Sequence, residues 1–194
     1  MKAFNGYENV KAITERPVLP VGGYIVKIKA AQVKEYNGQN GTFEKLEIAF
    51  DIAEGEYKGF YQADFDSQNT EDKKWKGVLR QYIPSDDGSE RDEKTKAFFK
   101  TMIEAIEDSN NGYHWDWDEK KLKGKTVGCI FRNEEWEWND KSGWRTAPFK
   151  FISAENIRDG KFKLPKDKPL ANKVSAPAGF TELDVSVDDD DLPF

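Results

Sequence analysis

Two stretches, GYIVKIKAAQV (residues 23–33) and KLEIAFDI (residues 45–52), decide the fold of this chain. In both, apolar and polar residues alternate, which is typical of half-buried β-strands. The turn-rich loop NGQNG (37–41) separates them, so we predict a β-hairpin. The residues expected on its core side are Tyr24, Val26, Ile28, Ala30, Leu46, Ile48, Phe50 and Ile52.

The register of this hairpin follows from its symmetry about the loop. Symmetric pairing places Lys27 opposite Asp51 and points every even-numbered apolar residue of both strands to one core. After the turn at residues 55–59 we predict a third strand at residues 60–66. The sheet then has three strands before the pattern changes.

Two later segments show helical periodicity. Apolar residues recur at helical spacing through residues 92–109, with Ser89 or Asp92 as the N-cap and the stop signal NNG (110–112) behind them. A shorter helix is predicted at residues 75–83, before Pro84.

A second hairpin is predicted from the strands at residues 126–138 and 144–152, joined by the loop NDKSG (139–143). A five-residue loop places Trp138 opposite Trp144. In that register Phe131, Phe149 and Phe151 point to the core.

The expected fold is mainly β with a helical insert: three strands, a helix, then two strands. This order resembles the OB-fold, a five-stranded, partly open barrel with its helix between strands three and four. We assign residues 1–164 to this domain. Residues 165–194, rich in Lys, Pro, Ala and Ser, are predicted to be a flexible linker and an acidic tail.

The charge of the chain is unevenly distributed. The net charge is −6, yet residues 180–194 hold six acids and no base, which leaves 30 bases and 30 acids before them. A neutral body permits a basic groove on one face. No run of about 18 apolar residues and no secretory signal is present, so we expect a cytoplasmic protein.

The tail ends in four aspartates followed by Leu192, Pro193 and Phe194. The aspartates repel one another and stay solvated, while Pro193 stiffens the step that delivers the Phe194 ring to a hydrophobic slot. The plainer interpretation is an acidic tail that only aids solubility.

The tip closely resembles that of bacterial single-stranded DNA-binding proteins, an acidic run followed by Ile or Leu, Pro and a terminal Phe. In that family the OB domain holds DNA and the tip recruits replication, recombination and repair enzymes. The resemblance implies partner binding by Asp188, Asp189, Asp190, Asp191, Leu192, Pro193 and Phe194. The segment LPVGGY (19–24) is similar to OB proteins of phages and mobile elements.

A binder of unpaired strands needs rings for base stacking and cations for phosphates. In the predicted register, one face of the second hairpin carries Trp136, Trp138, Trp144, Arg132, Thr146 and Lys150. The alternative is that these tryptophans cover a barrel end or a dimer contact.

Two other clusters compete for the DNA-binding role. One is Lys73, Lys74, Trp75 and Lys76, and the other is Lys27, Lys29 and Lys45 near Tyr36 and Phe43. Either suits an ordinary solvated face. A basic run at residues 120–125 ranks last.

We expect neither an enzyme nor a metal or cofactor, since one His and one Cys cannot build the usual catalytic sets. The remaining catalytic candidates are the Asp64–Asp66 and Asp116–Asp118 pairs, as Mg²⁺ ligands. The rival functions are an OB-like adaptor of the replication machinery that does not bind DNA, and a sugar-binding barrel. The sequence leaves the oligomeric state open, a homo-oligomer included.

Overall fold

The computed structural model describes residues 5–9, 17–38 and 41–170. Within them lies one antiparallel sheet of five strands in the order β3-β2-β1-β4-β5. The elements are η1 (Tyr7–Asn9), β1 (Gly23–Gly38), β2 (Gly41–Ile52), α1 (Phe60–Asp66), β3 (Val78–Tyr82), α2 (Glu90–Asp108), η2 (Glu119–Leu122), β4 (Thr126–Trp138), β5 (Lys141–Ile152) and α3 (Ala154–Arg158).

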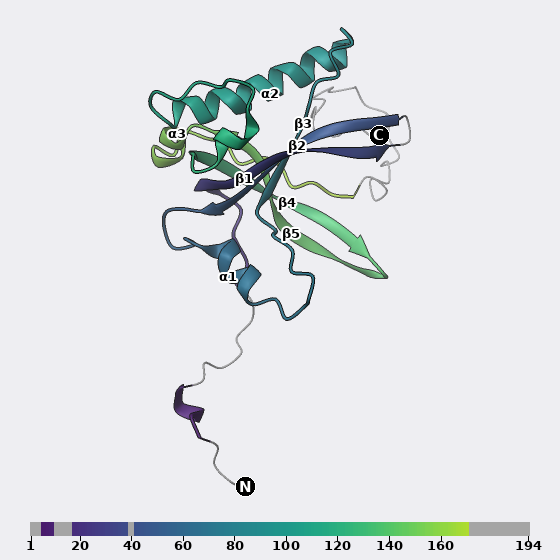
Figure 1. The fold of residues 1–194 in the computed structure, drawn as a ribbon. Coiled ribbons are helices and arrows are strands. Elements are labelled where there is room, and N and C mark those ends of the chain that lie inside the picture. Colours follow the sequence, from purple (N-terminus) through teal and green to yellow (C-terminus); the bar gives the residue numbers. More distant parts are fainter. Residues whose placement is uncertain (1–4, 10–16, 39–40, 171–194) are drawn as a thin grey trace, which may run out of the picture.

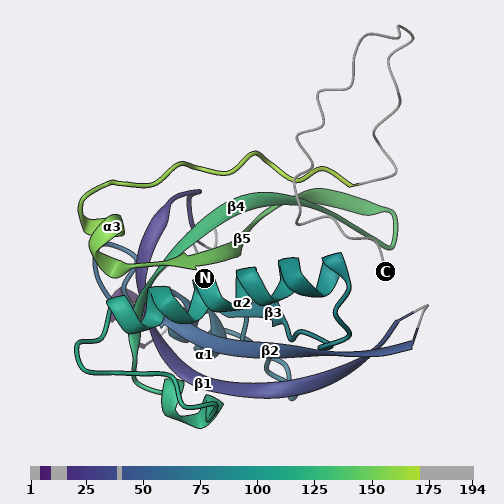
Figure 2. The ribbon, with the colours of Figure 1, turned by 90° about the horizontal axis from the view of Figure 1, so that it is seen from above.

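The sheet is open. Its two edge strands, β3 and β5, pair on one side only within the residues described. The β1–β2 and β4–β5 hairpins diverge toward their tips in both views (Figures 1 and 2). In Figure 1, α2 is drawn above the strands and α1 below them, and both helices contribute to one hydrophobic core. The mainly β class is therefore confirmed, and a closed barrel is not seen.

The first hairpin forms with the predicted register at its base. Lys27 pairs with Asp51, and Leu46, Ile48, Phe50 and Ile52 are buried. A β-bulge between Ile28 and Ala30 then shifts the alternation by one residue. Ala30 is consequently exposed, so the prediction that every even-numbered apolar residue faces the core is wrong beyond the bulge.

Residues 60–66 form the helix α1, not the predicted third strand. The cause is the buried carboxylate of Asp51, whose Oδ1 accepts from the Tyr61 amide at 2.9 Å and whose Oδ2 accepts from the Gln62 amide at 3.3 Å. These amides belong to the first turn of a helix and have no partner within it. Tyr61 then packs edge-on against Phe50.

The third strand is β3, in the segment for which a helix was predicted. Leu79 of β3 is buried and pairs with Ile48, so β3 extends the sheet beyond β2. Gly77 permits this approach, because a Cβ there would lie 2.5 Å from the Phe50 carbonyl oxygen. Three strands precede the long helix α2 and two follow it, as predicted, but α1 interrupts the first three between β2 and β3.

The helix α2 confirms its prediction to within two residues. Ser89 is the N-cap, and its side chain accepts from the Asp92 amide at 3.1 Å. Met102, Ile103, Ala105 and Ile106 are buried on its inner face.

The second hairpin forms with a different register from the one predicted. Its turn consists of Asn139 and Asp140, with φ angles of 46° and 61°, and positive φ at both residues is what a type I′ hairpin turn requires. Trp138 consequently pairs with Lys141, and Trp144 pairs with Glu135.

A short segment after α3 returns to β4. Lys168 forms a parallel bridge with Glu134, through backbone hydrogen bonds of 2.8 Å with Asn133 and Glu135. The predicted tail, including Asp188–Phe194, lies outside the described residues. No helix in the described ranges combines the length and apolar character that a membrane crossing requires.

Candidate nucleic-acid interface

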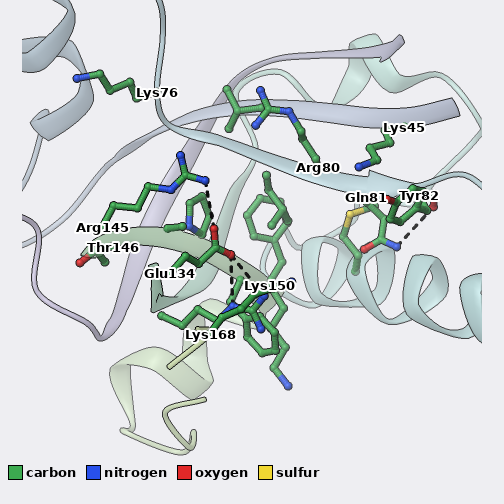
Figure 3. Close-up of a pocket in the computed structure, with 18 of the residues that line it drawn as sticks. Lys45, Lys76, Arg80, Gln81, Tyr82, Glu134, Arg145, Thr146, Lys150 and Lys168 are labelled. Carbon is green, nitrogen blue, oxygen red and sulfur yellow. Dashed lines mark hydrogen bonds and ion pairs between the residues drawn. The ribbon is translucent and has the colours of Figure 1, made fainter. Parts of the chain in front are cut away.

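A groove of about 1350 Å³ lies between β3 and β5, the two edges of the open sheet. The first half of α2, α1 and residues 17–19 complete its walls. Because β3 and β5 diverge instead of pairing, side chains from both line the same space. Figure 3 shows Arg80 and Tyr82 of β3 facing Arg145 and Lys150 of β5 across it.

The groove is strongly basic although the chain is acidic. Nine basic residues line it against three acids, while the whole chain carries −6. A cleft lined by one sign of charge concentrates the field and attracts polyanions. The bases are Lys45, Lys76, Arg80, Arg91, Lys94, Arg132, Arg145, Lys150 and Lys168, and the acids are Asp64, Glu90 and Glu134.

On the β3 side, Glu47 organises the charged and aromatic groups. Arg80 donates to Glu47 at 2.8 Å, and Tyr36 donates to the same carboxylate. Burial raises the pKa of Glu47, but the hydrogen bonds from Tyr36, Arg80 and Gln32 together outweigh it and lower that pKa below its usual value. Glu47 therefore stays ionised and keeps Arg80 at the rim of the groove.

Three rings gather beside this network. The Tyr36 and Phe43 rings are stacked at 5.7 Å, and Phe43 lies 5.5 Å from Tyr82. The Lys45 ammonium sits 4.1 Å from the centre of the Tyr82 ring. Rings and a cation on one strand surface are the combination that holds a nucleotide base and its phosphate.

On the β5 side, Arg132 and Arg145 share one carboxylate. Glu134 contacts Arg132 at 3.4 Å and Arg145 at 3.3 Å. The Arg132 guanidinium also lies over the Phe149 ring at 4.5 Å. Lys150 is exposed and pairs with no carboxylate among the described residues, so its charge is available to a ligand.

Six of the predicted DNA-binding residues line the groove. They come from all three predicted clusters, which the tertiary structure joins: Lys45, Trp75, Lys76, Arg132, Trp144 and Lys150. The indole of Trp75 donates to the Phe50 carbonyl at 3.0 Å, so part of its role is to hold the loop before β3.

The other six do not line the groove. Lys27 and Lys29 are exposed on β1, Lys73 and Lys74 are exposed before β3, and Trp136 and Trp138 lie toward the tip of the second hairpin. The predicted shared face of Trp136, Trp138 and Trp144 is wrong. Trp136 pairs with Gly143, one residue before Trp144, and neighbouring residues of a strand point to opposite faces.

Several groove residues were not found from the sequence. Arg80 and Tyr82 were missed because β3 was predicted to be a helix, which hid their alternation with Leu79 and Gln81. Arg91 and Lys94 share the groove face of α2 at a spacing of three residues, a signal that the sequence did contain. Arg145 and Lys168 were missed too.

The alternative metal-binding pairs have other partners. Asp64 pairs with Lys76 at 2.8 Å, and Asp116 accepts from Lys121, whose hydrogen bond lowers the pKa of Asp116. Within the described part of the chain, no three His, Cys, Asp or Glu side chains gather as a metal site requires. Cys129 is buried, and that burial raises the pKa of its thiol.

A scan against protein-family models returns no match, and a search of curated proteins finds no similar sequence.

Proposed function

We propose that this protein binds single-stranded DNA in the groove between β3 and β5, without strong sequence preference, during DNA replication, recombination or repair. The observation that carries the proposal is the nine-to-three excess of basic over acidic residues in that groove. Although the overall charge is −6, these cations come together on one concave surface from five separate elements, the loop before β3 and the Lys168 segment.

The rings favour an unpaired strand over a duplex. Trp144 and Phe98 are exposed on the groove walls, where flat ring faces are available. The bases of an unpaired strand can stack on them, whereas those of a duplex already stack on each other. Cations supply the phosphate contacts, and neither group reads base identity.

The strand order supports an OB-like, partly open barrel as part of the proposal. In the order β3-β2-β1-β4-β5, the two edge strands β3 and β5 frame the groove. OB-folds bind oligonucleotides on strands two and three and on the loops of the two hairpins, which here are β2, β3 and the hairpin tips. Lys45, Arg80 and Tyr82 occupy that surface.

The tail belongs to the proposal as its second half. Residues Asp188–Phe194 are proposed to recruit replication, recombination or repair enzymes to the bound strand. The support is their sequence alone, an acidic run followed by a Leu-Pro-Phe.

Charge reversal in the groove tests DNA binding. The variant Arg145→Glu/Lys150→Glu should lose binding of a fluorescently labelled oligo-dT by at least about tenfold, because two phosphate contacts become repulsive. Lys27→Glu/Lys29→Glu makes the same charge change on exposed residues of β1 and should retain most of the affinity.

Equal loss in both variants would mean that net charge alone drives association, and no binding by the wild type would refute the proposal. An adaptor that does not bind DNA predicts that last result together with intact recruitment through the tail.

A further inference from the structure

We propose that Arg132 and Arg145 form a phosphodiester site and that Glu134 occupies it until a nucleic-acid strand displaces its carboxylate. The inference rests on the proposed function, since it identifies where one phosphate of the strand binds. It also assigns Glu134 a role that weakens binding, although Glu134 is a lining residue of the groove.

The carboxylate lies where a phosphate group would lie. Glu134 Oε1 is 3.4 Å from both Nε and Nη2 of Arg132, and Oε2 is 3.3 Å from Nη2 of Arg145. Each oxygen thus serves one guanidinium, as the two non-bridging oxygens of a phosphodiester would. Figure 3 shows Glu134 reaching toward Arg145 on the neighbouring strand.

These contacts are longer than two other ion pairs made by residues of the groove, although Lys94 and Glu90 lie farther apart, at 3.6 Å. Arg80 contacts Glu47 at 2.8 Å, and Lys76 contacts Asp64 at the same distance. Charge-assisted hydrogen bonds of good geometry measure about 2.7–2.9 Å. Glu134 therefore holds its arginines loosely, and little bonding is lost when a phosphate replaces it.

The two arginines are prepared differently for this exchange. The Arg132 side chain is only 13% exposed and stacks on Phe149, so its position does not depend on Glu134 alone. The Arg145 side chain is 65% exposed and can follow an incoming strand. A fixed cation and an adaptable one together accept phosphates over a range of strand positions.

Removing the negative charge of Glu134 should consequently strengthen binding. Glu134→Gln keeps the shape of the side chain, and we expect oligo-dT affinity to rise by about threefold to tenfold at low salt, since one repulsive charge leaves the groove. The dependence of affinity on salt should steepen by up to about one counterion, because the phosphate no longer replaces an internal anion.

The experiment compares the wild type, Glu134→Gln, Arg145→Ala and the double variant by titration with oligo-dT. Glu104→Gln is the control, because it makes the same charge change on exposed α2 outside the groove. In the double variant the gain from Glu134→Gln should shrink, since one of the two arginines is gone. The second substitution Glu134→Ala and thermal unfolding of each variant exclude a folding defect as the cause of a change in affinity.

Unchanged or weaker binding by folded Glu134→Gln and Glu134→Ala would overturn the inference and make Glu134 a residue that only positions its arginines. A gain of the same size in Glu104→Gln would also overturn it. If the wild type binds but the Glu134 variants gain nothing, only this inference fails. If the wild type does not bind, the proposed function fails with it.

Discussion

Trp144 and Trp138 lie on the same hairpin but have different surroundings. Trp144 is 52% exposed and lines the groove, whereas Trp138 is 73% exposed near the turn and outside it. If a base stacks on Trp144, Trp144→Ala should weaken oligo-dT binding by about 1 to 3 kcal/mol. Isothermal titration calorimetry measures this difference directly.

Trp138→Ala is the matched control, and its affinity should change little. The opposite result, with Trp138 more important than Trp144, would move the binding surface from the groove to the hairpin tip.

Asp92 and Lys96 give a pH dependence of stability. The Lys96 ammonium forms an ion pair with Oδ2 of the buried Asp92 carboxylate at 2.9 Å, and this interaction lowers the pKa of Asp92. In the unfolded chain an aspartate has a pKa of about 3.9. The stabilisation is therefore fully present above about pH 4 and is lost as the pH falls toward the lower folded-state pKa.

Asp92→Asn should be less stable than the wild type at pH 7, and the difference should narrow below about pH 4. Urea unfolding at a series of pH values measures it. A constant difference across that range would show that the protonation of Asp92 does not contribute.

The helix α1 depends on a residue of a neighbouring strand. Asp51 in β2 accepts from amides of the first turn of α1, and Tyr61 of that helix packs on Phe50. Asp51→Ala leaves these buried amides without an acceptor, so the free energy of unfolding should fall by about 1 to 3 kcal/mol. Asp51→Asn keeps one acceptor oxygen and should lose less.

The contact between Asp51 and α1 also affects the wall of the groove. The chain runs from α1 to Trp75 and Lys76, and Lys76 pairs with Asp64 of α1. Hydrogen exchange of Asp51→Ala should show faster exchange in α1 and in the following loop than in α2. If the α1 amides exchange as slowly in Asp51→Ala as in the wild type, α1 forms without its hydrogen bonds to Asp51.

The whole molecule combines a basic groove with an acidic tail. A strand contacting three to five phosphates in the groove should give a slope of log affinity against log salt of about −2 to −3.5. Fluorescence titrations between low and moderate salt measure it. A slope near zero would exclude the phosphate contacts proposed for the nine cations.

Deletion of Leu192, Pro193 and Phe194 should leave oligo-dT affinity unchanged and abolish capture of replication and repair enzymes from a bacterial lysate. The deleted residues carry no cation, so the groove keeps its charge. Retained capture would refute the recruiting role of the tip.

The local sequence pattern was sufficient to predict those elements whose tertiary contacts favour the same secondary structure as their own residues do. The β1–β2 hairpin follows from alternation and a turn-rich loop, and α2 follows from helical spacing and the Ser89 cap. Alternation and capping depend on residues a few positions apart, and the sequence displays such relations directly. The uneven distribution of charge along the chain also follows directly from the sequence.

Segment 60–66 is a helix where a strand is predicted, and segment 78–82 is a strand where a helix is predicted. Contacts with distant residues determine both. Asp51 makes the first a helix by accepting its amides, and pairing with β2 makes the second a strand. A bulge near Ile28 and the Asn139–Asp140 turn shifted the two hairpin registers. Each shift moves all residues beyond it to the other face of the sheet. In the second hairpin this places Trp144 on the face opposite Trp136.

The sequence by itself therefore determined a mainly β chain with two hairpins, one long helix and an acidic end, because these properties are local. Only the tertiary structure decided the groove. Its cations come from positions 45 to 168 and meet because β3 and β5 are the two edges of one open sheet. Which side chains share a surface depends on register and strand order, and both result from packing between distant segments.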